Sequence, residues 1–138
     1  MKAKVLSFDE IKVGDSASFP RVFTEEEVVK FSELSGDMNP LHTDISYAKG
    51  TQFGQRLVHG MLLGSLCSRF VGMYIPGKKC LYLNQTLSFK KPVFIGDTVE
   101  VTGTVTSKSE LTKVLFIFIV IKKGEEIVMN GEAKVQVI

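Results

Sequence analysis

The sequence predicts an α+β protein in which an antiparallel sheet is wrapped around a long central helix. Helical patterns occur only in the first half of the chain, whereas the residues after Pro76-Gly77 form β-rich runs separated by short turns. Helices and strands that are segregated in this way, rather than alternating, are typical of an α+β fold with an antiparallel sheet. One helical segment, Gly60–Tyr74, is apolar on nearly every side, which predicts that it is buried. A sheet that curls around this helix accounts for both observations.

The length and composition indicate one soluble domain spanning residues 1–138. Hydrophobic residues make up 44% and charged residues 23%, as in ordinary globular proteins. The net charge of +2 comes from scattered basic residues, so we expect no nucleic-acid partner. The longest apolar run is far shorter than the roughly 20 residues that a membrane span needs. The N-terminal residues show no signal-peptide pattern, so we expect a cytoplasmic protein without membrane contact.

The two cysteines, Cys67 and Cys80, give no indication of a metal or redox site. They lack a C-x-x-C spacing, and no histidine stands near them to complete a zinc site. Cys67 lies in the apolar run MLLGSLCSRF, where a free cysteine usually acts as a small hydrophobic residue. We therefore expect no metal and no redox cofactor.

The first half of the chain begins with a strand and a capped helix. Ser16–Phe23 has the composition of a strand. Thr24 and Glu27 form the capping-box pattern that starts a helix, and apolar residues follow at helical spacing up to about Ser35. Gly36 is expected to end this helix.

After the first helix the sequence predicts a polar loop and a short helix, and after the buried helix it predicts four further strands. The loop has the sequence DMNPLHTD, and Asp44 at its end is expected to cap a short helix that extends to about Lys49. After the buried helix the predicted strands are Leu81–Val93, Asp97–Ser107, Lys113–Lys122 and Glu126–Ile138.

The third of these later strands contains the run VLFIFIVI, residues Val114–Ile121, which does not alternate as a strand with one wet face would. We expect both of its faces to be covered, and a single small sheet can hardly arrange this without a partner subunit. The run therefore predicts a homodimer with a continuous sheet across the interface.

The loop Gly36–His42 carries the residues best suited to catalysis. Asp37, Asn39 and His42 place three polar side chains within six residues. Pro40 restricts the backbone and so stiffens the loop. A carboxylate and an imidazole held close together can share acid and base roles around one water molecule. The same residue types are common turn formers, so their spacing alone leaves both interpretations open.

Small residues recur every four positions on the buried helix, at Gly60, Gly64, Ser68 and Gly72. Such a stripe allows a close approach to one helix face. We attribute Gly64 and Gly72 to tight packing of the helix on the sheet. Gly60 lies in the expected first turn, where a free backbone N–H can hold a carbonyl oxygen that develops negative charge. His59, directly before it, is interpreted as structural.

Three segments of the sequence together resemble one enzyme family. They are FTEEEVVKFSELSGDMNPLHTD, RLVHGMLLGSL and YLNQTLSFKKPVFIGDTV. They are similar to the MaoC-like (R)-specific enoyl-CoA hydratases of the hot-dog superfamily, in particular to the monofunctional single-domain members. The resemblance extends from about Val13 to the C-terminus and includes the complete GDxNPxH motif. It implies a hot-dog fold, with an antiparallel sheet around a long helix, and a homodimer with one extended sheet.

The resemblance also implies roles for individual residues. Asp37 and His42 match the catalytic pair, and Gly60 matches the glycine whose N–H forms the oxyanion hole. Asn39 matches the residue that helps to hold the pair and its water. Ser68 matches a helix serine that lines the substrate site.

The reaction implied by the resemblance is hydration of trans-2-enoyl-CoA to (R)-3-hydroxyacyl-CoA and the reverse dehydration. The substrate would be an acyl-CoA or acyl-carrier-protein thioester of fatty acid metabolism, with Lys90 and Lys91 as candidate coenzyme A contacts and no separate cofactor. A hot-dog acyl-CoA thioesterase and a non-catalytic acyl-thioester-binding subunit are the alternatives. The complete motif, with both Asp37 and His42, favours the hydratase.

Overall fold

The computed structural model describes all 138 residues and contains one six-stranded antiparallel sheet. The strand order is β1-β4-β5-β6-β2, and the short β3 also pairs with β6. The strands are β1 (Ser16–Val22), β2 (Cys80–Gln85), β3 (Ser88–Phe89), β4 (Thr98–Ser109), β5 (Val114–Lys123) and β6 (Glu126–Val137). The edges of the sheet are therefore formed by β1 on one side and by β2 and β3 on the other.

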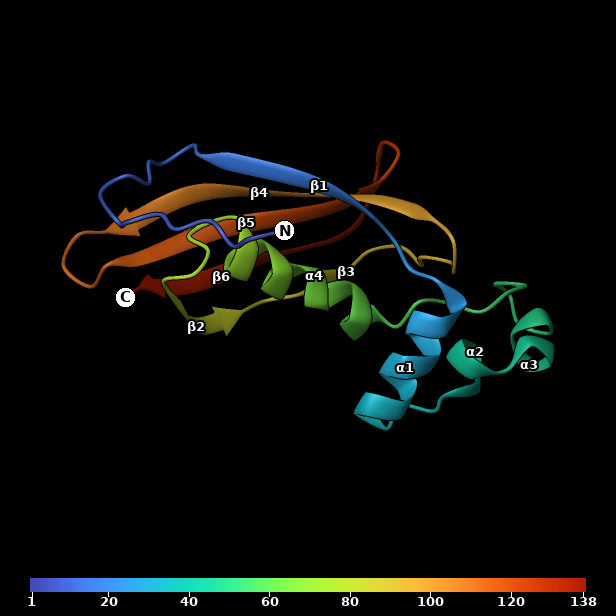
Figure 1. Ribbon diagram of the computed structural model, residues 1–138. Helices are drawn as coiled ribbons and strands as arrows, with labels where there is room; N and C mark the ends of the chain where they lie inside the picture. Colours follow the sequence, from blue (N-terminus) through green and yellow to red (C-terminus); the bar gives the residue numbers. More distant parts are fainter.

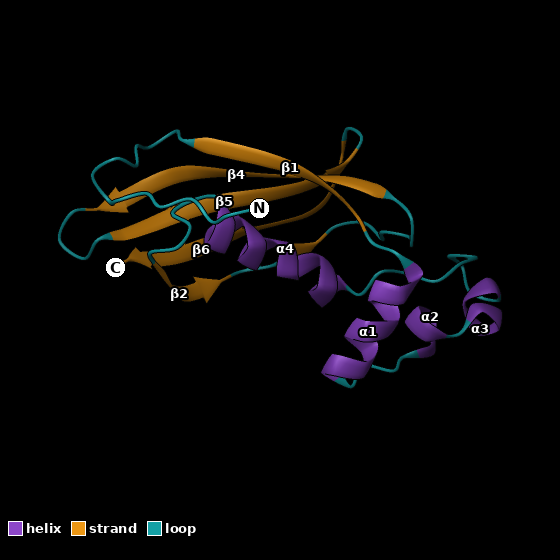
Figure 2. Cartoon of the chain, in the orientation of Figure 1, coloured by secondary structure: helices purple, strands orange, loops and turns teal.

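Helix α4 (Gly60–Met73) lies along one face of this sheet (Figure 1). The other helices are α1 (Glu25–Ser35), α2 (Pro40–Thr43) and α3 (Ile45–Lys49). Figure 2 shows them as a group beyond the sheet, next to the N-terminal end of α4. No helix is both long and apolar enough to cross a membrane. The arrangement confirms the predicted α+β fold with a sheet around a central helix.

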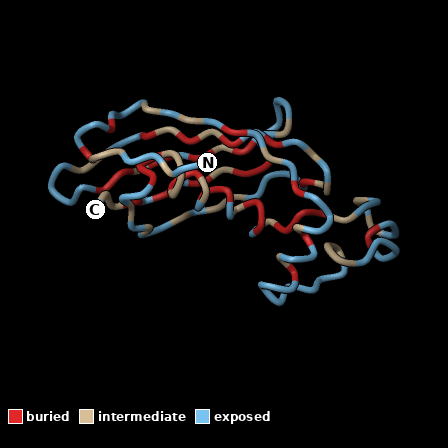
Figure 3. Tube along the Cα trace, in the orientation of Figure 1, coloured by how far each residue is buried: buried red, intermediate tan, exposed pale blue.

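The main core is formed between α4 and the sheet. Phe70 and Leu66 of α4 belong to the same buried cluster as Ile117 and Ile119 of β5. Figure 3 shows that buried positions follow α4 and the central strands. Gly103 of β4 permits this contact, because a Cβ atom at that position would lie only 2.4 Å from the Phe70 ring. The helix and the sheet thus approach more closely than a side chain at position 103 would allow.

Helix α1 begins and ends as predicted. The Thr24 hydroxyl accepts a hydrogen bond from the Glu27 N–H at 3.3 Å, and the Glu27 carboxylate accepts one from the Thr24 N–H at 2.9 Å. Gly36 ends the helix with a φ of +79°, a left-handed conformation that glycine adopts without strain. Asp44 caps α3 as expected by accepting a hydrogen bond from the Tyr47 N–H.

Helix α4 is less completely buried than its composition predicts. Met61 and Ser68 are exposed on the side that faces away from the sheet. A Cβ atom at Gly64 would lie 2.9 Å from the Leu87 side chain, which confirms tight packing there. No atom lies within 4 Å of the corresponding position at Gly72, so the prediction that Gly72 serves packing is wrong.

The predicted strand Leu81–Val93 is wrong in its extent. The first strand of this region ends at Gln85, and only Ser88–Phe89 pairs with β6 afterwards. Gly131 of β6 explains where the chain bends, because the Thr86 carbonyl oxygen lies only 1.8 Å from the position of an absent Cβ atom. A side chain at position 131 would collide with the Thr86 backbone, and glycine leaves room for it.

The prediction that both faces of the Val114–Ile121 run are covered does not hold within this chain. Ile117 and Ile119 are buried toward α4, whereas Phe118, on the opposite face, is 41% exposed. Strand β5 is also central, paired with β4 on one side and β6 on the other. It therefore cannot continue the sheet into a second subunit, and only the edge at β1 and the edge at β2 and β3 are free to do so.

Candidate active site

The polar segment after α1 is not an open loop as predicted, because it contains the short helix α2, which fixes His42. Asn39 caps this helix, with its Oδ1 accepting a hydrogen bond from the Leu41 N–H at 2.9 Å. Pro40 occupies the first helical position, where a missing N–H leaves no hydrogen bond unmade. The Asn-Pro pair was the available sequence signal for this turn of helix.

Asp37 lies on the turn that leads from α1 to this cap. Its Oδ1 accepts a hydrogen bond from the Asn39 N–H at 3.2 Å, and the residue is exposed. An ionised carboxylate has about four lone-pair sites, so most of its capacity is free for a water molecule or a substrate. Asn39 therefore supports Asp37 through its backbone and α2 through its side chain.

His42 is half-buried and oriented by a backbone carbonyl group. Its Nδ1 lies 2.8 Å from the carbonyl oxygen of Leu57. Because a carbonyl oxygen can only accept, Nδ1 carries the proton, and the lone pair of the neutral ring is on Nε2. The fold thus selects the tautomer in which Nε2 can accept a proton.

His59 is the buried neighbour of this pair, with only 1% of its surface exposed. Its Nε2 lies 3.0 Å from the Ser32 hydroxyl and 3.3 Å from the Asp37 carbonyl oxygen, and its Nδ1 has no partner. The ring stacks on the His42 ring with the centroids 3.9 Å apart. Burial, followed by the proximity of His42, lowers the pKa of His59. The ring is therefore neutral over a wider pH range than an exposed histidine.

The structure brings Asp37 and His42 together, as their spacing predicted, and adds His59 from a separate part of the chain. One side-chain ligand atom of each residue lies within 4.8 Å of the others. Sequence reasoning treated His59 as an isolated structural residue, and no local pattern connects it to Asp37 or His42. The cluster combines an exposed carboxylate with an oriented imidazole, which is a suitable arrangement for acid–base chemistry on water.

Gly60 and His42 line the same cavity, which encloses about 300 Å³. Gly60 is the first residue of α4, where the backbone N–H has no acceptor within the helix. A Cβ atom at Gly60 would lie 3.0 Å from the Phe89 ring, so the cavity is narrow at this point. Lys90 and Lys91 also line the cavity. Gly60, His42 and the two lysines therefore line one space, and Lys91 also pairs with Glu126 at 3.5 Å.

Ser68 is not part of this cavity. It lies two helical turns beyond Gly60, a distance of about 12 Å along the axis. There it lines a different cavity of about 310 Å³ together with Gly64 and Tyr82. Within one chain, the structure does not bring Ser68 together with Asp37 and His42.

The sheet around a central helix, with a polar cluster at that helix's N-terminal end, defines a protein of the hot-dog fold. The chain matches the family described as "MaoC like domain" over residues 9–121. It belongs to this family.

Relatives of known activity resemble the chain over nearly its full length. It is 42% identical over 135 residues to the (R)-specific enoyl-CoA hydratase of Aeromonas caviae, which covers 95% of this chain and 98% of the relative. It is 36% identical over 134 residues to the 3-hydroxybutyryl-CoA dehydratase of Methylorubrum extorquens, with 97% and 85% covered. The solved structure of the A. caviae (R)-hydratase superimposes with a TM-score of 0.90 at 41% identity, covering 93% of this chain and 98% of the other. An R-hydratase from Pseudomonas aeruginosa gives 0.93 at 33% identity, covering 98% and 87%.

Proposed function

We propose that this protein hydrates trans-2-enoyl-CoA to (R)-3-hydroxyacyl-CoA and catalyses the reverse dehydration. Its class, a hydro-lyase, follows from the nearly full-length similarity to hydratases and a dehydratase. The observation that carries the mechanism is the position of His42 and Gly60 on one cavity, with Asp37 beside His42. The proposed substrate is a coenzyme A or acyl-carrier-protein thioester, and no further cofactor enters the reaction.

In the proposed mechanism Asp37 and His42 bind one water molecule between them. The oxygen of this water forms a bond to C3, while the π electrons of the C2=C3 bond move toward the thioester carbonyl. The lone pair on His42 Nε2 can accept a proton from the water, and Asp37 can accept its other hydrogen bond. The pair then delivers one proton to C2, so that the elements of water add across the double bond.

Gly60 is proposed to stabilise the intermediate of this addition. Negative charge develops on the thioester oxygen when C3 is attacked. The N–H of Gly60 has no helical acceptor and can donate a hydrogen bond to that oxygen. The N-terminal end of α4 adds a favourable dipole.

The remaining predicted residues are assigned supporting roles. Asn39 positions Asp37 by donating its backbone N–H to the carboxylate. Lys90 and Lys91 offer positive charge to the phosphates of coenzyme A at the cavity. Ser68, on the exposed side of α4, is proposed to line the path of the acyl chain rather than to touch the reacting atoms.

We also propose that the protein is a homodimer joined at the free edge of β2. This strand pairs with β6 on one side only, and its Leu81 and Leu83 side chains are 51% and 45% exposed. An unpaired strand edge with apolar side chains is a favourable surface for pairing with a second copy.

The hydratase mechanism is tested by Asp37→Asn and His42→Ala, assayed with crotonyl-CoA through its enoyl absorbance. A positioned acid or base contributes about 10²–10⁴-fold, so each variant should lose that much in kcat/KM. Because the two residues act on the same water, the double variant should be little worse than the poorer single variant. Asp37→Asn keeps the shape and the hydrogen-bond acceptor of the turn, so it should remain folded.

Each result of this assay has a clear meaning. A folded Asp37→Asn protein within threefold of wild-type activity would contradict the mechanism. Release of free thiol by the wild type would indicate a thioesterase. Binding of crotonyl-CoA without a change in absorbance would indicate a non-catalytic subunit.

A further inference from the structure

We propose that the cavity between α1, α4 and β1 is a second binding site, specific for an aliphatic carboxylate. The cavity encloses about 490 Å³, which is larger than the space at His42 and Gly60. Its size is within the range of small-molecule sites in proteins. None of its lining residues belongs to the proposed catalytic set.

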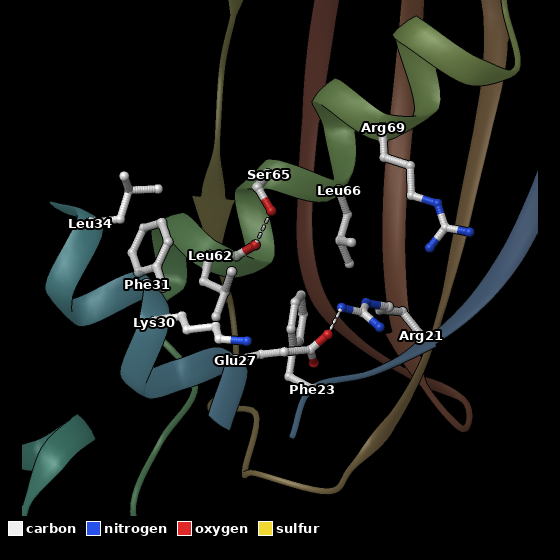
Figure 4. Close-up of a pocket in the computed structure, with 10 residues that line it drawn as sticks. All are labelled: Arg21, Phe23, Glu27, Lys30, Phe31, Leu34, Leu62, Ser65, Leu66 and Arg69. Atoms are coloured by element: carbon white, nitrogen blue, oxygen red, sulfur yellow. Dashed lines mark hydrogen bonds and ion pairs between the residues drawn. The ribbon is translucent and has the colours of Figure 1, made fainter. Parts of the chain in front are cut away.

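One end of this cavity is apolar. Phe31 and Leu34 of α1 and Leu62 of α4 come together there, and Figure 4 shows them on the side away from the arginines. Leu34 is 86% exposed, so its side chain forms part of the rim rather than of the core. This end offers an open apolar surface to a hydrocarbon chain.

The other end carries a guanidinium group that has no acceptor. Arg69 lines the cavity, yet it forms no ion pair and no hydrogen bond with any residue of the chain; its only polar interaction is with the face of Phe19, whose centroid lies 4.4 Å from its Cζ. Phe19 is itself buried and stacks on Tyr74 at 4.9 Å. The aromatic stack therefore holds the guanidinium in place while its N–H donors stay available.

The neighbouring cations each have a carboxylate partner. Arg21 pairs with Glu27 at 2.5 Å, and Lys30 pairs with Glu26 at 2.6 Å. Arg69 is thus the one cation of the cavity without a counter-charge. In Figure 4, Arg69 and Arg21 reach from α4 and β1 toward the same end of the cavity.

These features favour a ligand with one negative charge and an alkyl chain. A guanidinium binds a carboxylate through two parallel hydrogen bonds, and a preorganised guanidinium loses little freedom in doing so. A single unpaired cation matches the single charge of a carboxylate. The chain of such a ligand would lie over Leu62 and Phe31 and extend toward Leu34.

The site is adjacent to the catalytic cluster without sharing its polar groups. Phe31 lines the cavity, and its ring contacts the His59 ring edge-on at 4.9 Å. Addition of water to the double bond of an enoyl thioester does not require the carboxylate site, so the two proposals can fail separately.

The test is calorimetric titration of the full-length protein with sodium octanoate, and with 1-octanol as an uncharged probe of the same chain length. We expect one octanoate per chain, bound more tightly than octanol. Arg69→Gln should weaken octanoate binding about tenfold to a hundredfold, the usual effect of losing hydrogen bonds to a charged group. Leu34→Glu, at an exposed position, should weaken it as well by placing a negative charge at the apolar end. Lys134→Gln removes one exposed cation from β6 and should leave binding unchanged.

Methyl NMR of the wild type locates the bound octanoate. Shifts at Leu34, Leu62 and Leu66 would support the site, whereas shifts confined to Leu57 and Leu63 of the catalytic cavity would overturn it. Equal affinity of Arg69→Gln and wild type, or equal affinity for octanol and octanoate, would also overturn it. Because no thioester is present, these outcomes do not depend on hydratase activity.

Discussion

At the level of single residues, the proposed chemistry depends on the hydrogen bonds made by the ring nitrogens of two stacked histidines. His42 donates its Nδ1 proton to the Leu57 carbonyl and so presents Nε2 as a base. His59 uses its Nε2 toward Ser32 and the Asp37 carbonyl, and it is buried beneath the His42 ring. A neutral His59 supports the cluster by packing and hydrogen bonding, without adding a second positive charge beside His42.

The lowered pKa of His59 predicts how stability depends on pH. Burial keeps this pKa below the ordinary value of about 6.5, so between the two values the unfolded chain binds more protons than the folded chain. The free energy of unfolding should therefore rise with pH up to about 6.5 and then level off. Urea unfolding at pH 5.5 and 7.5 measures this difference, which should shrink in His59→Gln. If the change in unfolding free energy between the two pH values were the same in His59→Gln as in the wild type, His59 would not be its cause.

Two substitutions at Gly60 distinguish the effect of losing its backbone N–H from the effect of adding a side chain. Gly60→Pro removes the proposed oxyanion donor at a position where proline suits the start of a helix, and it should lower kcat about 10²–10³-fold. Gly60→Ala keeps the N–H and adds a Cβ atom 3.0 Å from the Phe89 ring, whose residue is half-exposed and free to shift. We expect Gly60→Ala to retain far more activity. Equal losses in the two variants would point to crowding instead.

At the scale of elements, the contact of α4 with the sheet decides which glycines are required. Gly103 of β4 faces the fully buried Phe70 ring, whereas Gly72 of α4 faces open space. The two glycines thus have opposite packing environments, although both lie inside regular elements.

Alanine substitution should therefore have opposite effects at these two positions. Gly103→Ala forces Phe70 to move in a filled core and should cost about 1–3 kcal/mol of unfolding free energy. Gly72→Ala meets no atom and should stabilise the protein by up to about 1 kcal/mol, because alanine favours the helix. Thermal and urea unfolding of both variants measure the effects. A stable Gly103→Ala protein would show that α4 lies farther from β4.

At the scale of the whole molecule, the sheet order determines where a second copy can bind. Because β5 is a central strand, the Val114–Ile121 run cannot pair edge to edge with a second copy. The edge at β2, in contrast, has exposed apolar side chains. Met61 and Ser68, on the outer side of α4, are also exposed, so no other part of the chain covers this side of the helix.

The dimer proposal predicts that charges on the edge strand separate the subunits. Light scattering should show a dimer for the wild type at micromolar concentration, and a monomer for the double variant Leu81→Glu and Leu83→Glu. Val13→Glu is the control, because Val13 is 59% exposed and lies just before β1, the strand at the opposite edge of the sheet. A wild-type monomer, or a double variant that stays dimeric, would contradict pairing through β2.

Most of the helices and strands, and the polar segment of the site, can be inferred from local sequence patterns, although the predicted strand Leu81–Val93 is too long. The capping box at Thr24, the cap at Asp44 and the closely spaced Asp37 and His42 all depend on neighbours a few residues apart. Hydrogen bonds and periodicity over such short distances are properties of the local chain, so they can be inferred without a fold. The same reasoning missed the turn of helix at Pro40, because one helical turn has too few residues to show a period.

Which distant groups meet is a property of the tertiary structure. It placed His59 under His42, assigned the His42 proton through the Leu57 carbonyl, and separated Ser68 from both. It also left Arg69 without a counter-charge beside an apolar cavity. These relations depend on how α1, α2 and α4 pack at one end of the sheet. Such packing is set by burial of many side chains at once, and no local spacing in the sequence encodes it.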